Sequence, residues 1–189
     1  MRSVWMFAGV GLLFAAAVWS ADGDAAGPIS AVWKEQQLSF FYMGRTSRYS
    51  CSGLRDKVRA LLLELGARRD LTVTALGCEE PDSRARLGSL GPSLNIVFSA
   101  PALPQASQKA LHPGDVGAVD AQFESLVITN DVFRNMGIAD CELVQEFARQ
   151  ILPRFVIRNM KQDILCVPSP QSGSHFLVRG EILRSLQSR

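Results

Sequence analysis

A pattern of cysteine, amphipathic helix, strand and cysteine occurs twice in the sequence, in the same order. Cys51 and Cys78 bound the first copy and are 27 residues apart, and Cys141 and Cys166 bound the second at a separation of 25. In a β-α-β unit the helix begins at the sheet edge where the second strand ends, so the two cysteines of one copy should lie close together. Four cysteines allow three pairings on paper. This geometry favours the disulfides Cys51–Cys78 and Cys141–Cys166.

The first copy has the clearest helix in the chain. An apolar and aromatic run predicts a strand over residues 37–43, and alternating apolar and hydroxyl side chains predict another over 71–77. Ser50 is the expected N-cap of the helix between them, with Ser52 as the alternative, and Gly66 supplies the left-handed residue that ends it. The predicted buried stripe of this helix consists of Leu54, Val58, Leu61, Leu62 and Leu65.

The second copy begins at Asp140, which we expect to cap a helix that Pro153 ends or kinks. Strand-like residues follow at 155–157 and 164–167, with a polar stretch between them. The predicted buried stripe of this second helix consists of Val144, Phe147, Ala148, Ile151 and Leu152.

Further strands are predicted over residues 94–98 and 123–129, which could pair as a long-looped hairpin, and over 175–178. These elements indicate an α+β sandwich, with two main helices on a mixed, mostly antiparallel sheet. Its most specific form would be a ferredoxin-like β-α-β-β-α-β core with additional strands. The folded part is expected to be one α+β domain (37–189) that contains two disulfide-linked modules (37–78 and 122–167).

The amino terminus has the layout of a secretory signal. A positive start at Arg2 is followed by an uncharged apolar run over residues 4–19 and then by a polar stretch. Cleavage is expected after Ser20, or alternatively after Ala26, which would leave a flexible mature N-terminus over residues 21–36. The run is shorter than the roughly 20 residues of a spanning helix, so no stable membrane span is expected after cleavage. The sequence therefore predicts a periplasmic or secreted protein, and an even cysteine count agrees with export.

Charge and ligand spacing exclude several classes of function. The chain has 20 Lys and Arg against 18 Asp and Glu, a balance that lacks the concentrated basic face of nucleic-acid-binding proteins. No Cys-x-x-Cys is present, which argues against a thioredoxin-like redox site and a paired-cysteine zinc site. The two histidines and the acidic residues show no metal-ligand spacing, so neither a metal nor a cofactor is expected.

One stretch has the character of an anion-binding segment. It directly precedes the first helix, whose free amides and positive dipole end favour a carboxylate, a phosphate or an acidic partner loop. The alternative, which helix starts commonly follow, is a capped and solvated turn whose arginines pair with Asp or Glu. The candidate binding residues are Arg45, Thr46, Ser47, Arg48, Tyr49 and Ser50.

A catalytic function would depend on two histidines. His112 lies in a turn-like segment where Asp115 could orient it, and His175 opens a predicted strand. No Gly-x-Ser-x-Gly motif accompanies them, and a histidine in a turn is usually only solvent-exposed. A small hydrolase or transferase, with a site near Arg45–Tyr49 and His112, is therefore the alternative function.

Residues 46–51, 53–59 and 66–68 resemble a small exported family of proteobacteria to which no function is assigned. The resemblance covers mainly residues 37–78. It implies bacterial export, and it supplies no catalytic or binding residue. The leading prediction is an exported, non-enzymatic binding or structural protein that acts on another protein or on an envelope component.

Overall fold

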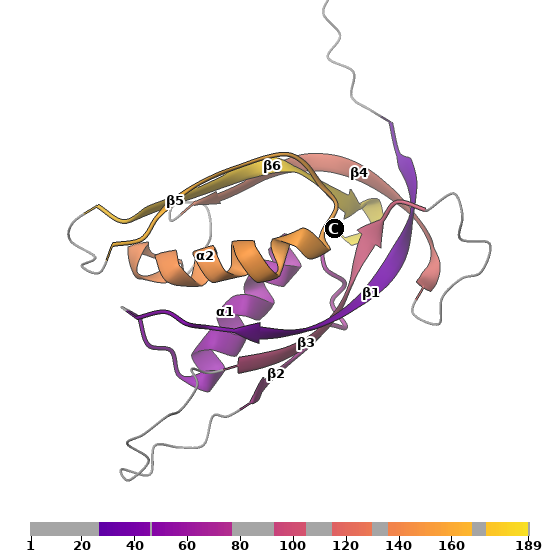
Figure 1. Cartoon of the computed structure of the whole chain (residues 1–189). Helices are drawn as coiled ribbons and strands as arrows, with labels where there is room; N and C mark the ends of the chain where they lie inside the picture. Colours follow the sequence, from indigo (N-terminus) through magenta and orange to yellow (C-terminus); the bar gives the residue numbers. More distant parts are fainter. Residues whose placement is uncertain are drawn as a thin grey trace, which may run out of the picture.

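Six strands form one antiparallel sheet that curves around two helices in this computed structural model (Figure 1). The structure describes residues 27–45, 47–76, 93–104, 115–129, 136–167 and 173–188. The strands are β1 (Ile29–Phe41), β2 (Thr72–Leu76), β3 (Ser93–Ala102), β4 (Asp115–Thr129), β5 (Ile157–Leu165) and β6 (His175–Ser185). The helices are α1 (Cys51–Glu64) and α2 (Cys141–Gln150), with short 3-10 turns η1 (Ile138–Asp140), η2 (Leu152–Arg154) and η4 (Leu186–Ser188). Within these described ranges no helix has the length and hydropathy needed to cross a membrane.

The sheet has the strand order β2-β3-β1-β4-β6-β5, which confirms the predicted α+β class. β1 and β2 are both antiparallel to β3, which lies between them, so the β1-α1-β2 unit has the expected parallel strands. The ferredoxin-like arrangement is not confirmed, because β4 precedes α2 and the strand after α2, β5, lies at the sheet edge beside β6. The predicted hairpin of residues 94–98 and 123–129 is wrong, since the strands that contain them, β3 and β4, lie on opposite sides of β1.

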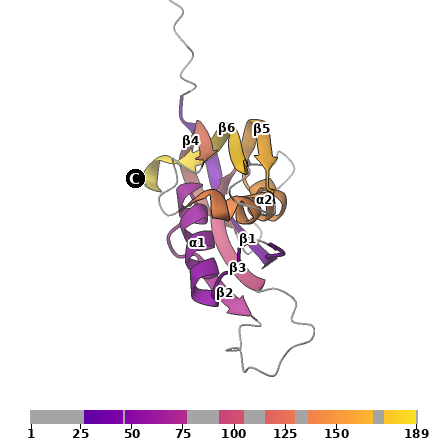
Figure 2. The ribbon, with the colours of Figure 1, turned by 90° about the vertical axis from the view of Figure 1, so that its left-hand side faces the viewer.

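β1 is longer than the sequence predicted and holds the two halves of the sheet together. Residues 29–36, expected within a flexible N-terminus, are strand. β1 pairs with β3 along Val32–Phe41 but with β4 only along Ile29–Lys34, and the register with β4 shifts between Val32 and Trp33. The two views place β2 and β3 beside α1, and β5 and β6 beside α2 (Figure 2).

The main core lies between the helices and the concave face of the sheet. Both predicted helical stripes are fully buried, which confirms the 3.6-residue periodicity used to find them. Phe98 of β3 stacks on Phe155 with ring centroids 5.2 Å apart. A smaller cluster covers the opposite face where β1, β4 and β6 meet, and it consists of Ala31, Trp33, Val119, Ala121 and Leu183.

The two helix starts differ from one another. The Ser50 hydroxyl accepts a hydrogen bond of 3.1 Å from the Gly53 amide, which confirms it as the N-cap of α1. Gly66 follows that helix with a φ of +87°, as predicted. Asp140 occupies the predicted N-cap position of α2, but its side chain bonds no amide of that helix. A 3-10 turn precedes this helix, and the Asp140 carboxylate instead accepts a 2.7 Å hydrogen bond from the Gly137 amide.

Cys141 and Cys166 form the predicted disulfide, with Cα atoms 5.6 Å apart. The bond ties the first residue of α2 to the residue that follows β5. Cys51 is also disulfide-bonded. Its predicted partner, Cys78, lies outside the described residues. Since Cys141 and Cys166 bond to each other, neither of the two alternative pairings is possible.

Candidate functional site

The predicted anion-binding segment lies along the start of α2. The Arg45 amide donates a 2.8 Å hydrogen bond to the Glu142 carboxylate, and the Ser47 hydroxyl donates to the Ala139 carbonyl. Tyr42, at the end of β1, donates from its hydroxyl to the Ser47 carbonyl at 2.9 Å. Thr46 lies outside the described residues. An amide and a hydroxyl group of the segment therefore bond to α2 and to the turn that precedes it.

A buried carboxylate completes this attachment. Asp140 is only 5% exposed, and it accepts hydrogen bonds from the Tyr49 hydroxyl and the Gly137 amide. Lys57 of α1 lies 2.9 Å from its second oxygen and 5.9 Å from the Tyr49 ring centroid. We call these four residues the Asp140 clamp. Because a buried charge is costly unless it is paired and hydrogen-bonded, the clamp fixes α1 relative to α2.

Tyr49 of the clamp and Tyr42 beside it both remain protonated at neutral pH. Burial, together with the nearby Glu142 and Asp140 carboxylates, raises the pKa of Tyr42 to about 12. Burial and the hydrogen bond to Asp140 raise the pKa of Tyr49 still further. Their rings meet edge to face at 5.0 Å. Neither hydroxyl has the pKa of a general acid or base that works near neutrality.

In the described part of the chain, the side chains of the two arginines in the predicted segment take no part in its attachment to α2. Arg45 and Arg48 are both exposed. Neither side chain has an ion-pair partner within the part of the chain that the structure describes. The predicted pairing of these arginines with Asp or Glu is thus not seen, and anion binding by residues 45–50 stays a prediction.

The histidines form no catalytic group in the described ranges. His112 lies outside them, so its convergence with Ser47 or Ser50 stays untested. His175 is half-exposed at the start of β6, and its Nε2 lies 3.1 Å from Asp163 of β5. The hydrogen bond to Asp163 raises the pKa of His175. Among the described residues, no three His, Cys, Asp or Glu side chains are close enough to hold a metal ion.

A polar cavity lies at the carboxyl-terminal end of α1. Its volume is about 920 Å³, within the range of small-molecule sites. The wall is formed by the end of α1 and the turn after it, by Trp33 of β1, by Glu124 of β4, and by the end of β6. We call it the arginine cavity, after the four guanidinium groups in its lining: Arg59, Arg68, Arg69 and Arg184.

Local contacts hold two of these arginines in place. Arg59 donates to the Leu71 carbonyl at 2.9 Å and to the Arg69 carbonyl at 3.4 Å. Arg68 binds the Asp70 carboxylate through two nitrogens, at 2.8 and 2.5 Å, which lowers the pKa of Asp70. Arg68 also lies over the Trp33 ring, 5.9 Å from its centroid. A planar guanidinium held on an aromatic face is pre-organised to bind an oxyanion.

Arg184 forms an ion pair with Glu124 but has one buried donor that no described residue satisfies. Its Nε atom is buried, and it has no hydrogen-bond partner among the described residues. Its Nη1 atom is 3.6 Å from Glu124, too far for a hydrogen bond, and Glu124 accepts one from Gln122 at 2.9 Å. The stem of Arg184 packs against Gly66, where an added Cβ would lie 3.1 Å from Cγ. The side chain is therefore held at the cavity wall with an unused donor.

Sequence reasoning missed this cavity because its residues come from four separated segments. Arg59 lies on α1, whereas Arg184 lies in β6, more than 100 residues further along the chain, and no sequence pattern links the two. The Arg68–Arg69 pair beside Gly66 was the one local signal.

Comparisons with protein-family models, with curated proteins and with solved structures find no match for this chain.

Proposed function

We propose that the chain is an exported, non-enzymatic binding protein that holds a small carboxylate or phosphate in the arginine cavity. The observation that carries the proposal is the buried Nε atom of Arg184, which lacks a partner in the described part of the chain. Buried donors are nearly always satisfied, so an oxygen of a bound anion is a natural partner for this one. Arg59, Arg68 and Arg69 line the same cavity and add positive charge.

The wall of the cavity suits a ligand that is not purely ionic. Trp33 and Leu63 contribute apolar surface to a lining that also contains Glu64 and Glu124. The two glutamates would repel a highly charged polyanion. A compact anion with a small apolar part fits this combination best.

Titration calorimetry with inorganic phosphate and with butyrate, a compact carboxylate with a small apolar part, tests the site. Arg184→Gln removes the unsatisfied donor but keeps a polar side chain, and we expect it to weaken binding at least about tenfold, as for a lost charge-assisted hydrogen bond. Arg154→Gln alters an exposed arginine outside the cavity lining and is the matched control.

The double variant Arg45→Gln/Arg48→Gln separates the two anion sites. If phosphate or butyrate binds in the arginine cavity, this variant keeps its affinity. Loss of binding in this double variant, with affinity retained in Arg184→Gln, would place the site at residues 45–50 instead. No binding of either anion by the unmodified chain at millimolar concentration would remove the proposal.

Export rests on two observations. The Cys141–Cys166 disulfide is typical of oxidising compartments outside the cytosol, and residues 1–20 have the layout of a signal peptide. Expression in a bacterial host should deliver the protein to the periplasm with a mass that lacks residues 1–20 or 1–26. Recovery of the intact chain from the cytosol, with thiols that alkylate without reductant, would contradict export.

A further inference from the structure

The strands that the structure describes cover only half of one long side of β1. Along this side β4 pairs with Ile29–Lys34, whereas β3 follows the opposite side as far as Phe41. Between residues 35 and 41 no strand of the described part occupies the β4 side. Among the described residues this stretch of β1 is consequently an open sheet edge, and it lies next to α2 (Figure 1).

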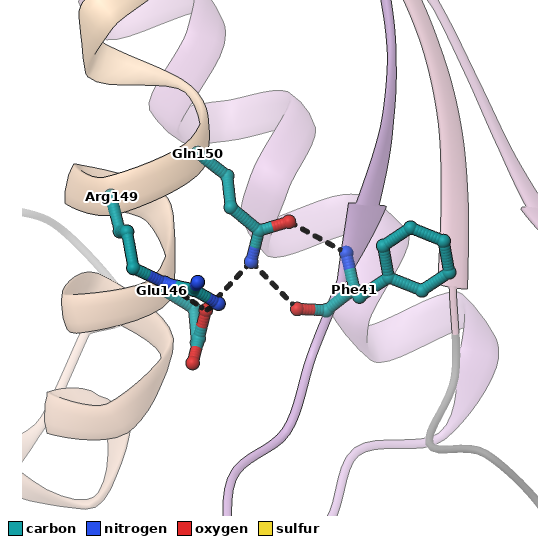
Figure 3. Close-up of polar contacts among 4 residues, drawn as sticks. All are labelled: Phe41, Glu146, Arg149 and Gln150. Carbon is teal, nitrogen blue, oxygen red and sulfur yellow. Dashed lines mark hydrogen bonds and ion pairs between the residues drawn. The ribbon is translucent and has the colours of Figure 1, made fainter.

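A side-chain amide occupies the last position of this edge. The Phe41 amide donates to Gln150 Oε1 at 3.0 Å, and Gln150 Nε2 donates to the Phe41 carbonyl at 2.8 Å (Figure 3). A residue in a neighbouring antiparallel strand exchanges this same pair of hydrogen bonds. The primary amide of Gln150 therefore stands in for the peptide group of a missing strand.

The Gln150 amide is oriented by its own helix. Nε2 also donates to Glu146 at 2.6 Å, and Arg149 binds the same Glu146 oxygen at 2.5 Å (Figure 3). Since Phe41 directs its amide and carbonyl away from β3, Ser39 and Gln37 must do the same, because alternate residues of a strand point alike. Within the described residues these two have no hydrogen-bond partner on that side.

Beyond Glu35 the open edge lacks the devices that usually protect sheet edges, which are charge, bulges and short length. Gln37 and Ser39 are uncharged and exposed, and the ladder with β3 is regular from Val32 to Phe41. The outer edge strand β5, in contrast, has charged residues and a register shift between Arg158 and Lys161. The other outer edge, β2, has only five residues.

We propose that this edge, residues 35–41 of β1, binds an extended peptide segment of a partner protein as an added antiparallel strand. The segment would lie in line with β4 and bond the free backbone groups of Gln37 and Ser39. Addition of a strand to an exposed edge is an established mode of peptide recognition. The peptide residue opposite Phe41 meets a ring that is 48% exposed and is β-branched or aromatic, and the residue opposite Glu35 is basic.

The probe is a blocked heptapeptide of alternating valine and threonine, with valine first and lysine last. In amide correlation spectra of the labelled full chain, we expect saturable shifts at residues 37–41 and none in the arginine cavity. A control peptide with two adjacent central prolines lacks donors on both edges, and it should produce no shifts.

Two substitutions at one position separate backbone from side-chain recognition. Ser39→Pro removes the edge-facing donor without breaking a bond to β3, and it should weaken peptide binding at least about tenfold. Ser39→Val keeps the donor and should bind as the unmodified chain does. Gln150→Ala frees Phe41 for the peptide and should tighten binding severalfold.

Three results would overturn the proposal. Equal affinity of the Ser39→Pro and Ser39→Val variants would show that backbone pairing is not involved. Slow hydrogen exchange at Gln37 and Ser39 in the free protein would show that the edge is already covered. Concentration-dependent shifts at these residues without peptide would assign the edge to a second copy of this chain.

Discussion

At Gly66 the backbone has a φ of +87°, and the stem of Arg184 fills the space where a side chain would project. Both conditions make a Cβ at this position unfavourable. We predict that Gly66→Ala lowers the free energy of unfolding by about 1–2 kcal/mol, because alanine must adopt the left-handed region and displace Arg184. Urea denaturation measures this change.

The matched control is Gly137→Ala. Gly137 has a φ of −121°, and nothing lies within 4 Å of an added Cβ. Its amide hydrogen bond to Asp140 survives the substitution. A loss of stability at position 137 as large as that at position 66 would contradict the argument from conformation and space.

The chain has two tyrosines, so phenolate absorbance at 295 nm reports Tyr42 and Tyr49 alone. In the folded protein we predict almost no ionisation at pH 10, the ordinary tyrosine pKa, and a first midpoint at about 12. The raised pKa values mean that the tyrosines contribute their stability below pH 10 and lose it as the pH rises through 12. Half-ionisation at pH 10 under native conditions would show that neither hydroxyl is buried as described.

Among the elements, the Asp140 clamp is the main polar link between α1 and α2. We predict that Asp140→Asn destabilises the protein by about 2–4 kcal/mol, because it leaves the Lys57 ammonium without its carboxylate and weakens the bond from Tyr49. Chemical denaturation of this variant, of Lys57→Met and of the double variant gives the coupling. A double variant no more stable than expected from additive single effects would mean that the pair does not interact.

The disulfide from α2 to the end of β5 is a second link at this scale. Its sequence separation is 25, for which the chain-entropy model gives a contribution of about 3–4 kcal/mol. The Cys141→Ser/Cys166→Ser variant should therefore denature at lower urea concentration than the unmodified protein under oxidising conditions. A midpoint unchanged by this double substitution would show that the bond adds no stability.

Local patterns predicted the helices well and the sheet poorly. The apolar stripes and the Ser50 and Gly66 termini depend on neighbours within a few residues, and all were correct. The position of Asp140 before α2 was correct, but the partner of its side chain could not be predicted, because Tyr49 is 91 residues distant. The arginine cavity could not be found from spacing either, since its residues converge only when β6 returns to the end of α1.

In the whole molecule, β1 belongs to both halves of the sheet. We therefore predict one cooperative unfolding transition, not the two that independent disulfide-linked modules would give. Far-ultraviolet circular dichroism and tryptophan fluorescence, which includes the buried Trp33, should have coincident urea midpoints. Separate midpoints would show that the halves unfold independently.

The sequence indicated an α+β class but not the strand order, for a physical reason. The residue pattern of a strand shows that the segment is extended and which of its faces is apolar. It does not show which other strand lies next to it in the sheet. β1 pairs with strands that begin at Ser93 and Asp115, far along the chain. Pairings of this range are decided by the packing of the complete domain.

The distant partners of β1 also govern the order of events during biosynthesis. β1 leaves the ribosome before either of its partners: one neighbour begins at Ser93, and the second follows at Asp115. A protein with such long-range pairings has a high contact order and folds slowly, on the scale of milliseconds to seconds. A chain that stays unfolded for this time remains competent for translocation in the extended state.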